Sequence, residues 1–173
     1  AAPGGWLGDA QPPRVLAADN RRPIAVLCRR SVGSTGKPAR VVENHDEVHA
    51  ALRAAGWDVV VHDARRLPDA RGQCEMFFQA ELIVGPHGAG LTNMLCARAG
   101  VAVIEIKQSD GGLNGSFKHL AEALGLRWVG LNTTPPFSLP FFGSGQVNAS
   151  AVKEAAAGAM RDRVTLRCPD EPP

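Results

Sequence analysis

Five short apolar runs alternate with segments of helical character, and this alternation is the feature that most restricts the fold. The apolar runs are residues 24–28, 57–62, 82–84, 101–106 and 126–131. The segments predicted as helices are residues 44–55, 73–80, 91–99, 116–124 and 148–163. Apolar runs of strand length separated by helices are typical of a parallel sheet covered on both faces. The sequence therefore predicts an α/β fold with a Rossmann-like parallel sheet.

The 173 residues, 45% of them hydrophobic, suffice for one substantial core. We expect residues 1–22 to form a linker or edge segment, residues 23–147 the Rossmann-like domain, and residues 148–173 a carboxyl-terminal helix and tail. Residues 132–146, rich in proline and phenylalanine, are expected to form an ordered or docking loop. The chain lacks an initiator methionine, which favours a piece of a longer polypeptide with any targeting segment upstream.

The charge balance and the arrangement of acidic residues indicate which partners the chain is not expected to bind. With 19 basic and 17 acidic residues the net charge is only +2, so no nucleic-acid surface is expected. The chain holds no Asp-x-Asp sequence. A dedicated metal site is therefore not predicted either.

Three asparagines begin glycosylation sequons, where chance would give roughly one: Asn114, Asn132 and Asn148. This indicates a secretory environment. The even number of cysteines without a CxxC spacing leaves disulfides open. We expect Cys28 and Cys96 to be plain core residues, and Cys168 to be a disulfide partner whose mate the sequence does not identify.

Residues 82–92 run from a buried strand into a glycine-rich turn that opens a predicted helix. Gly88 and Gly90 lack the Cβ atoms that would keep a phosphate away from the backbone, and the first N–H groups of a helix favour anions. The glycines at positions 85, 88 and 90 do not form the G-x-G-x-x-G pattern of dinucleotide-binding folds, and the turn follows the third strand. The turn therefore predicts a phosphate site while arguing against NAD.

Other candidate residues also follow predicted strands, where doubly wound sheets bind ligands. Arg29 or Arg30 can pair with a pyrophosphate, and only one of the two is expected to face inward. Glu105 can accept the two ribose hydroxyls, or it is a salt-bridged or solvated strand end.

His87 lies in the glycine turn itself. Its imidazole can donate to a phosphate, polarise a sugar hydroxyl or act as a general base, or it braces the loop through a backbone carbonyl. Asn44 and Glu47 have the spacing of a helix N-cap and a helical acid at N3, which explains both residues structurally.

The segment QCEMFFQAELIVGPHGAGLTN (residues 73–93), followed by VIEI (residues 103–106), resembles glycosyltransferase family 61. The arginines at positions 29 and 30 and the segment RVVEN (residues 40–44) are similar to that family's arginine loop and Arg-x-x-x-Asn element. The resemblance covers about residues 24–131.

The resemblance implies one lobe of a two-lobed GT-B glycosyltransferase, namely the carboxyl-terminal, donor-binding lobe. It implies that a UDP-sugar is used without a metal and that the glycosidic bond forms with inversion. The nucleotide-phosphate loop would then be His87, Gly88, Ala89, Gly90, Leu91 and Thr92. Glu105 would bind the ribose or the donor sugar, Arg29 or Arg30 the diphosphate, and Arg40 and Asn44 would lie at the donor site, against the cap interpretation of Asn44. His87 is the only candidate base in this chain.

The implied partners are a UDP-sugar donor carrying xylose, N-acetylglucosamine or arabinose, a glycan or glycoprotein acceptor, and an amino-terminal lobe of the same polypeptide. The implied location is the Golgi or endoplasmic reticulum lumen, with a membrane anchor upstream of this chain. Two other hypotheses remain: an NAD-binding oxidoreductase domain, and a non-catalytic nucleotide-binding module.

Overall fold

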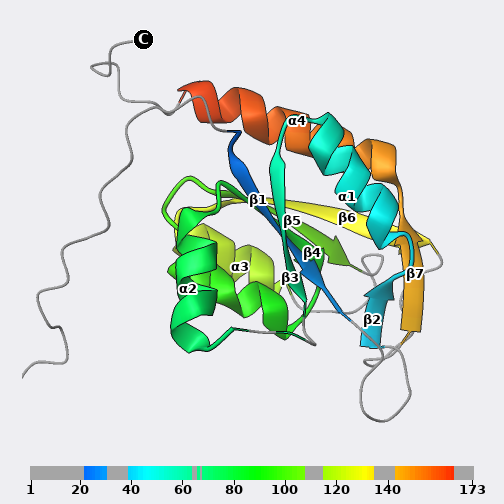
Figure 1. Cartoon of the computed structure of the whole chain (residues 1–173), viewed down its shortest axis with the longest axis horizontal. Helices are drawn as coiled ribbons and strands as arrows, with labels where there is room; N and C mark the ends of the chain where they lie inside the picture. The colour runs from blue at the N-terminus through cyan, green and yellow to red at the C-terminus, as the bar shows by residue number, and fades with distance from the viewer. Residues whose placement is uncertain are drawn as a thin grey trace, which may run out of the picture.

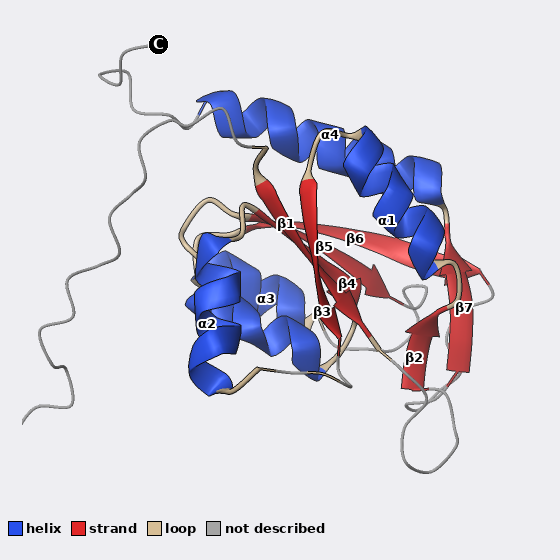
Figure 2. Ribbon diagram, viewed as in Figure 1, coloured by secondary structure: helices blue, strands red, loops and turns tan. Residues whose placement is uncertain are grey.

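The computed structural model describes residues 22–30, 39–63, 66, 68–107, 115–134 and 143–165. Its centre is a seven-stranded sheet with the order β2-β7-β6-β5-β4-β1-β3 (Figure 2). The strands are β1 (Ile24–Arg29), β2 (Ala39–Val42), β3 (Asp58–Asp63), β4 (Leu82–Pro86), β5 (Ala102–Lys107), β6 (Arg127–Thr134) and β7 (Gly143–Val147).

Five of these strands form the parallel sheet that the sequence predicts, in the order β3-β1-β4-β5-β6. When β2 is set aside, this is the 2-1-3-4-5 winding of flavodoxin-like folds. The order of the strands reverses between β1 and β4. In open α/β sheets the carboxyl ends of the strands at such a reversal form the usual ligand crevice.

Helices cover both faces of the sheet (Figure 1). The α1 helix (His45–Ala54) and the α4 helix (Ala149–Thr165) lie on one face. The other face carries α2 (Ala70–Gln79), the 3-10 helix η1 (Ala89–Cys96) and α3 (Ser116–Ala123). Successive residues of β1 alternate between the two apolar layers, as the two-residue period of a strand requires: Leu27 packs in the first layer, and Val26 and Cys28 in the second.

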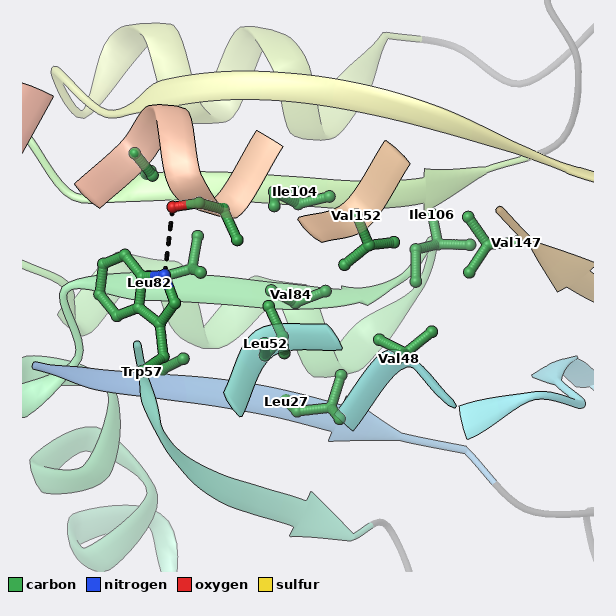
Figure 3. Packing of buried hydrophobic residues seen from close by; sticks show 14 of the residues in the cluster. Leu27, Val48, Leu52, Trp57, Leu82, Val84, Ile104, Ile106, Val147 and Val152 are labelled. Atoms are coloured by element: carbon green, nitrogen blue, oxygen red, sulfur yellow. Dashed lines mark hydrogen bonds between the residues drawn. The ribbon is translucent and has the colours of Figure 1, made fainter. Parts of the chain in front are cut away.

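The layer under α1 and α4 is fully packed at the amino-terminal end of the sheet. Trp57, which precedes β3, is completely buried, and its indole N–H donates to the carbonyl of Ala156 on α4 at 3.1 Å (Figure 3). The α4 helix also buries Val152 and Ala159 in this layer. The carboxyl-terminal helix therefore packs across the same sheet as α1.

Two strands were not predicted from the sequence. Residues 132–146, expected to be a loop, contain the end of β6 and most of β7, which pair antiparallel through Thr133 and Val147. The β7 strand in turn pairs parallel with β2. Both β2 and β7 are short, and β7 reads GSGQV, so neither shows an apolar run.

The helix predicted at residues 91–99 is a 3-10 helix and spans Ala89–Cys96. Gly88 before it has a φ of +147°, and Ala97 after it is extended, with a ψ of 151°. Gly90 in the first turn weakens a regular α-helix, and short 3-10 segments are common in such connections.

One disulfide joins α2 to η1, between Cys74 and Cys96, with the Cα atoms 5.2 Å apart. The expectation that Cys96 is a plain core residue is therefore wrong, because pairing depends on how η1 packs on α2. Cys28 is buried and free, as expected, and burial raises the pKa of its thiol to about 12. Cys168 lies outside the described residues.

Candidate functional site

The candidate site lies where β1 and β4 end, at the reversal of strand order. Arg29 and Arg30 stand at the end of β1, and His87 and Gly88 follow β4. Neighbouring parallel strands end at the same edge of the sheet, so the predicted arginine and glycine elements are brought together there.

The backbone of Gly88 supports the guanidinium of Arg30. A Cβ atom at position 88 would lie only 1.9 Å from Nη1 of Arg30, and the φ of +147° is one that L-residues rarely adopt. Nη1 of Arg30 also donates to the carbonyl of His87 at 3.3 Å. Only glycine therefore allows this close approach.

Arg40 reaches the same glycine from β2. In the pairing of β2 with β7, Ala39 faces Gly143 and Val41 faces Ser144, so Arg40 is the extra residue of a β-bulge. It is the one described residue other than glycine with a positive φ, at 57°. The Nη2 atom of its side chain is 3.4 Å from the Cβ position of Gly88. The bulge thus turns this side chain toward the loop after β4.

Two partly buried cations consequently meet above Gly88. Burial lowers the pKa of Arg30. Burial lowers the pKa of Arg40 as well, and the nearby charge of Arg30 lowers it further. Guanidinium groups bind carboxylate and phosphate oxygens through paired hydrogen bonds, so an anion between them would offset both the burial and the repulsion.

Next to this pair, His87 and Glu105 form a buried dyad. His87 is 8% exposed and Glu105 3% exposed. Nδ1 of His87 is hydrogen-bonded to Oε1 of Glu105, and the indole N–H of Trp128 donates to Oε2 at 2.8 Å. Phe117 packs edge-on against the imidazole with the ring centroids 4.9 Å apart. Because an ionised carboxylate only accepts, Nδ1 carries the proton and Nε2 is the ring nitrogen left to accept one.

Glu105 has the contacts of an ion-paired strand end, which is one of the two alternatives that the sequence left open for it. Its Oε1 pairs with His87 and its Oε2 accepts from Trp128. The observed contacts are those of a group that orients the imidazole.

The three atoms nearest the Cβ position of Gly88 belong to Arg30 and Arg40, and none belongs to Arg29 or Asn44. Arg29 lies near His45, whose pKa it helps to lower, so Arg30 is the arginine of the pair that turns inward. Asn44 stands at the N-cap of α1, but its side chain does not cap the helix. Instead, its amide bonds both the N–H and the carbonyl of Val147, at 3.1 Å and 2.8 Å. The predicted N-cap position of Asn44 is therefore confirmed, and its Nδ2 also donates to Oε2 of Glu47 at 3.0 Å. Its side chain makes no bond to the helix N–H groups, because β7 offers the amide two partners at once.

The residues of the predicted phosphate loop differ in which of their groups are free to contact a ligand. Ala89 and Thr92 are exposed. Leu91 is fully buried and its N–H donates to the carbonyl of Gly88 at 2.9 Å, so neither its side chain nor its N–H is available to a ligand. Of the backbone of this loop, the turn at residues 88–90 is therefore the part that we expect a ligand to contact.

Three residues near the site were not singled out from the sequence: Phe117, Trp128 and His45. The first two lie far along the chain from His87, on α3 and β6, and no motif marks them. Within the described segments, no group of three or more His, Cys, Asp or Glu residues is arranged to hold a metal ion.

Among solved structures, this chain is similar to a diflavin flavoprotein A3 from Nostoc sp., at 15% identity and a TM-score of 0.55, over 83% of this chain and 97% of that one. Flavodoxins from Megasphaera elsdenii and Streptococcus pneumoniae match at 16% and 12% identity, each with a TM-score of 0.46. They cover 80% of this chain and 98% and 99% of their own. The first of these similarities supports the flavodoxin-like winding and nothing about ligands.

A search of curated proteins finds no match. The family model described as glycosyltransferase 61, in contrast, matches residues 9–104, which is more than half of the chain. The match includes both arginines above Gly88 and the whole glycine loop. The chain belongs to the glycosyltransferase 61 family.

Proposed function

We propose that this chain is the donor-binding lobe of an inverting glycosyltransferase of GT-B type, and that it holds the diphosphate of a UDP-sugar above Gly88. The observation that carries the proposal is the meeting of the Arg30 and Arg40 guanidiniums at one glycine. A nucleoside diphosphate has two adjacent anionic groups, which match two adjacent cations better than a single phosphate does.

The backbone adds to this match. The first N–H groups of a helix have no acceptor within the helix, and η1 begins directly after Gly88. The two arginines and the glycine turn lie at the strand-order reversal, where α/β folds place nucleotides. These features support a phosphate position between the two arginines and the turn at residues 88–90.

The same groups suit the departure of UDP. When the bond from the anomeric carbon to the diphosphate breaks, negative charge develops on the phosphate oxygen. Fixed guanidiniums and N–H groups stabilise such charge without reorganising, and can do so in place of a metal ion. Arg30 and Arg40 thereby assist the leaving group.

His87 is the base that this chain can supply. With Nδ1 bonded to Glu105, Nε2 can accept the proton of an acceptor hydroxyl. The oxygen of that hydroxyl then attacks the anomeric carbon from the side opposite UDP, which gives inversion. Glu105 stabilises the resulting imidazolium, and Trp128 holds Glu105 in place.

The proposal extends to the acceptor and to the cellular location. We infer a glycan or glycoprotein acceptor, donors carrying xylose, N-acetylglucosamine or arabinose, and an amino-terminal lobe supplied by the same polypeptide. The Cys74–Cys96 disulfide and two exposed sequon asparagines, Asn132 and Asn148, fit the lumen of the Golgi or endoplasmic reticulum. No helix in the described part of the chain is long and apolar enough to cross a membrane.

The test is a thermal-shift and calorimetric panel of UDP, UMP, uridine, GDP, NAD and FMN on the chain. The proposal expects UDP to bind best, UMP more weakly and uridine weakest, since the affinity comes mainly from the diphosphate. Stabilisation by NAD or FMN but not by UDP would contradict it and favour an oxidoreductase domain. No effect of any nucleotide would favour a non-catalytic module.

A further inference from the structure

His45, the first residue of α1, is a buried titratable residue that the proposed mechanism does not use. It is only 8% exposed, and neither of its ring nitrogens has a hydrogen-bond partner among the described residues. Oδ1 of the neighbouring Asp46 is 3.8 Å from Nδ1, which is beyond hydrogen-bond distance. Buried polar groups are nearly always paired in native proteins, so an imidazole with two open positions needs an explanation.

The position of His45 gives that explanation. The α1 helix begins beside β2, near the end of β1 (Figure 1), so its first turn lies at the same edge of the sheet as the arginines above Gly88. Arg29, at the end of β1, is close enough to influence the charge of His45. The α1 and η1 helices cover opposite faces of the sheet and both begin at this edge. His45 thus lies at the edge of the sheet where the donor site is proposed, on the face opposite η1.

The protonation state of His45 indicates which chemical group of a ligand it can bind. Burial first, and then the charge of Arg29, lower its pKa from the ordinary value of 6.5, so the ring is neutral at neutral pH. A neutral imidazole offers one donor and one acceptor. A hydroxyl group both donates and accepts, whereas a phosphate oxygen only accepts. A hydroxyl can therefore bond to either ring nitrogen of a neutral histidine, by accepting from one or donating to the other.

We infer that His45 binds a sugar hydroxyl of the donor nucleotide, either on the ribose or on the transferred sugar. This inference rests on the proposed function and adds a second contact region to it. It also accounts for a buried polar group that the folded chain leaves without a partner.

The first test is the stability of the unliganded chain. In His45→Leu an apolar side chain of similar size replaces two unsatisfied nitrogens, so we expect the Tm to rise by about 2–4 °C. The control is His49→Leu, one turn later on the same helix, where we expect no such rise. A fall in Tm for His45→Leu would show a structural role and overturn the inference.

The second test measures binding of UDP, 2′,3′-dideoxy-UDP, UDP-xylose and UDP-N-acetylglucosamine to the same variants. A loss of roughly tenfold for UDP that disappears with the dideoxy analogue identifies the ribose. A loss confined to one of the UDP-sugars identifies the transferred sugar. Equal losses for UDP and the dideoxy analogue, or no loss for any ligand, would overturn the inference while leaving the proposed function intact. Failure of the wild-type chain to bind any of the four would overturn both.

Discussion

The two ends of the central sheet satisfy their polar groups in opposite ways. At the amino-terminal end of the strands, Trp57 is buried with its only polar atom bonded to the carbonyl of Ala156. At the carboxyl-terminal end, Arg30 and Arg40 repel each other and His45 is buried without a hydrogen bond. Strain and unsatisfied groups persist in a fold when they serve binding or catalysis. The comparison separates the end that stabilises the fold from the end at which we propose that an anionic ligand binds.

The largest effect on stability is expected at the amino-terminal end. Trp57→Ala should lower the free energy of unfolding by about 3–5 kcal/mol, because it leaves a large cavity and removes the donor to the buried Ala156 carbonyl. Chemical denaturation measures this loss. The milder Trp57→Phe, which removes mainly the hydrogen bond, should retain the wild-type affinity for UDP. A tenfold weaker affinity for UDP in Trp57→Phe would show that the two ends are not separate.

The next effect comes from the link between α2 and η1. Replacing Cys74 and Cys96 together by serine should lower the free energy of unfolding by about 2–4 kcal/mol, since the disulfide closes a loop over a sequence separation of 22 residues. Denaturation of the double variant against wild type measures this. Cys28→Ala serves as the control for loss of a buried thiol outside the link. An unchanged stability of the double variant would contradict a disulfide at this position.

For the carboxyl-terminal end, Arg30→Ala should weaken UDP binding by about 1.5–3 kcal/mol, or roughly 10- to 150-fold in Kd. Its stability should not fall by a similar amount, because the substitution also relieves the repulsion with Arg40. Calorimetric titration with UDP measures the first effect. The matched control is Arg71→Ala on α2, a solvent-exposed arginine paired with Glu75. Equal affinities for Arg30→Ala and wild type would remove Arg30 from the site.

Replacing one glycine at the site and one glycine in α4 by alanine also compares the two ends of the sheet. Gly88→Ala should destabilise the chain by about 1–3 kcal/mol, since its φ is +147° and the new Cβ would collide with Arg30. Gly158→Ala in α4 has its nearest neighbour at 3.7 Å and should stabilise by about 0.5–1 kcal/mol through helix propensity. Thermal denaturation of both variants decides the sign of each effect. A tolerated Gly88→Ala would contradict the close approach of Arg30.

The smallest effect concerns pH. Because the pKa of His45 is lowered below 6.5 in the folded chain, the unfolded chain binds a proton first as the pH falls. His45 therefore reduces stability progressively below about pH 6.5 and has no such effect above pH 7. The difference in unfolding free energy between wild type and His45→Leu should widen from pH 7 to pH 5. A constant difference over this range would contradict the lowered pKa.

Much of the fold follows from local patterns in the sequence. The strands β1, β4 and β5 are buried on both sides and appear as continuous apolar runs, so their existence and parallel arrangement can be predicted. The β2 and β7 strands cannot, because they are short, and β2 pairs only with β7 and contains a bulge. The pairing of Cys74 with Cys96 likewise depends on packing between helices.

Site residues that directly follow a strand could be predicted from the sequence. Site residues that the fold brings together from distant segments could not. The glycine loop and Arg30 follow strands directly, which sequence patterns reveal. Arg40 reaches Gly88 only through the bulge of β2. Glu105 was predicted as a ligand, and only the fold shows that Trp128 and His87 occupy its two oxygens. Nothing in the sequence distinguishes His45 from the other residues at the start of α1.

The most direct measurement is a crystal structure of this chain with UDP. The account predicts that the diphosphate lies within hydrogen-bond distance of the guanidiniums of both Arg30 and Arg40, above the backbone of residues 88–90. A UDP molecule bound elsewhere, with these two arginines in their unliganded contacts, would contradict it.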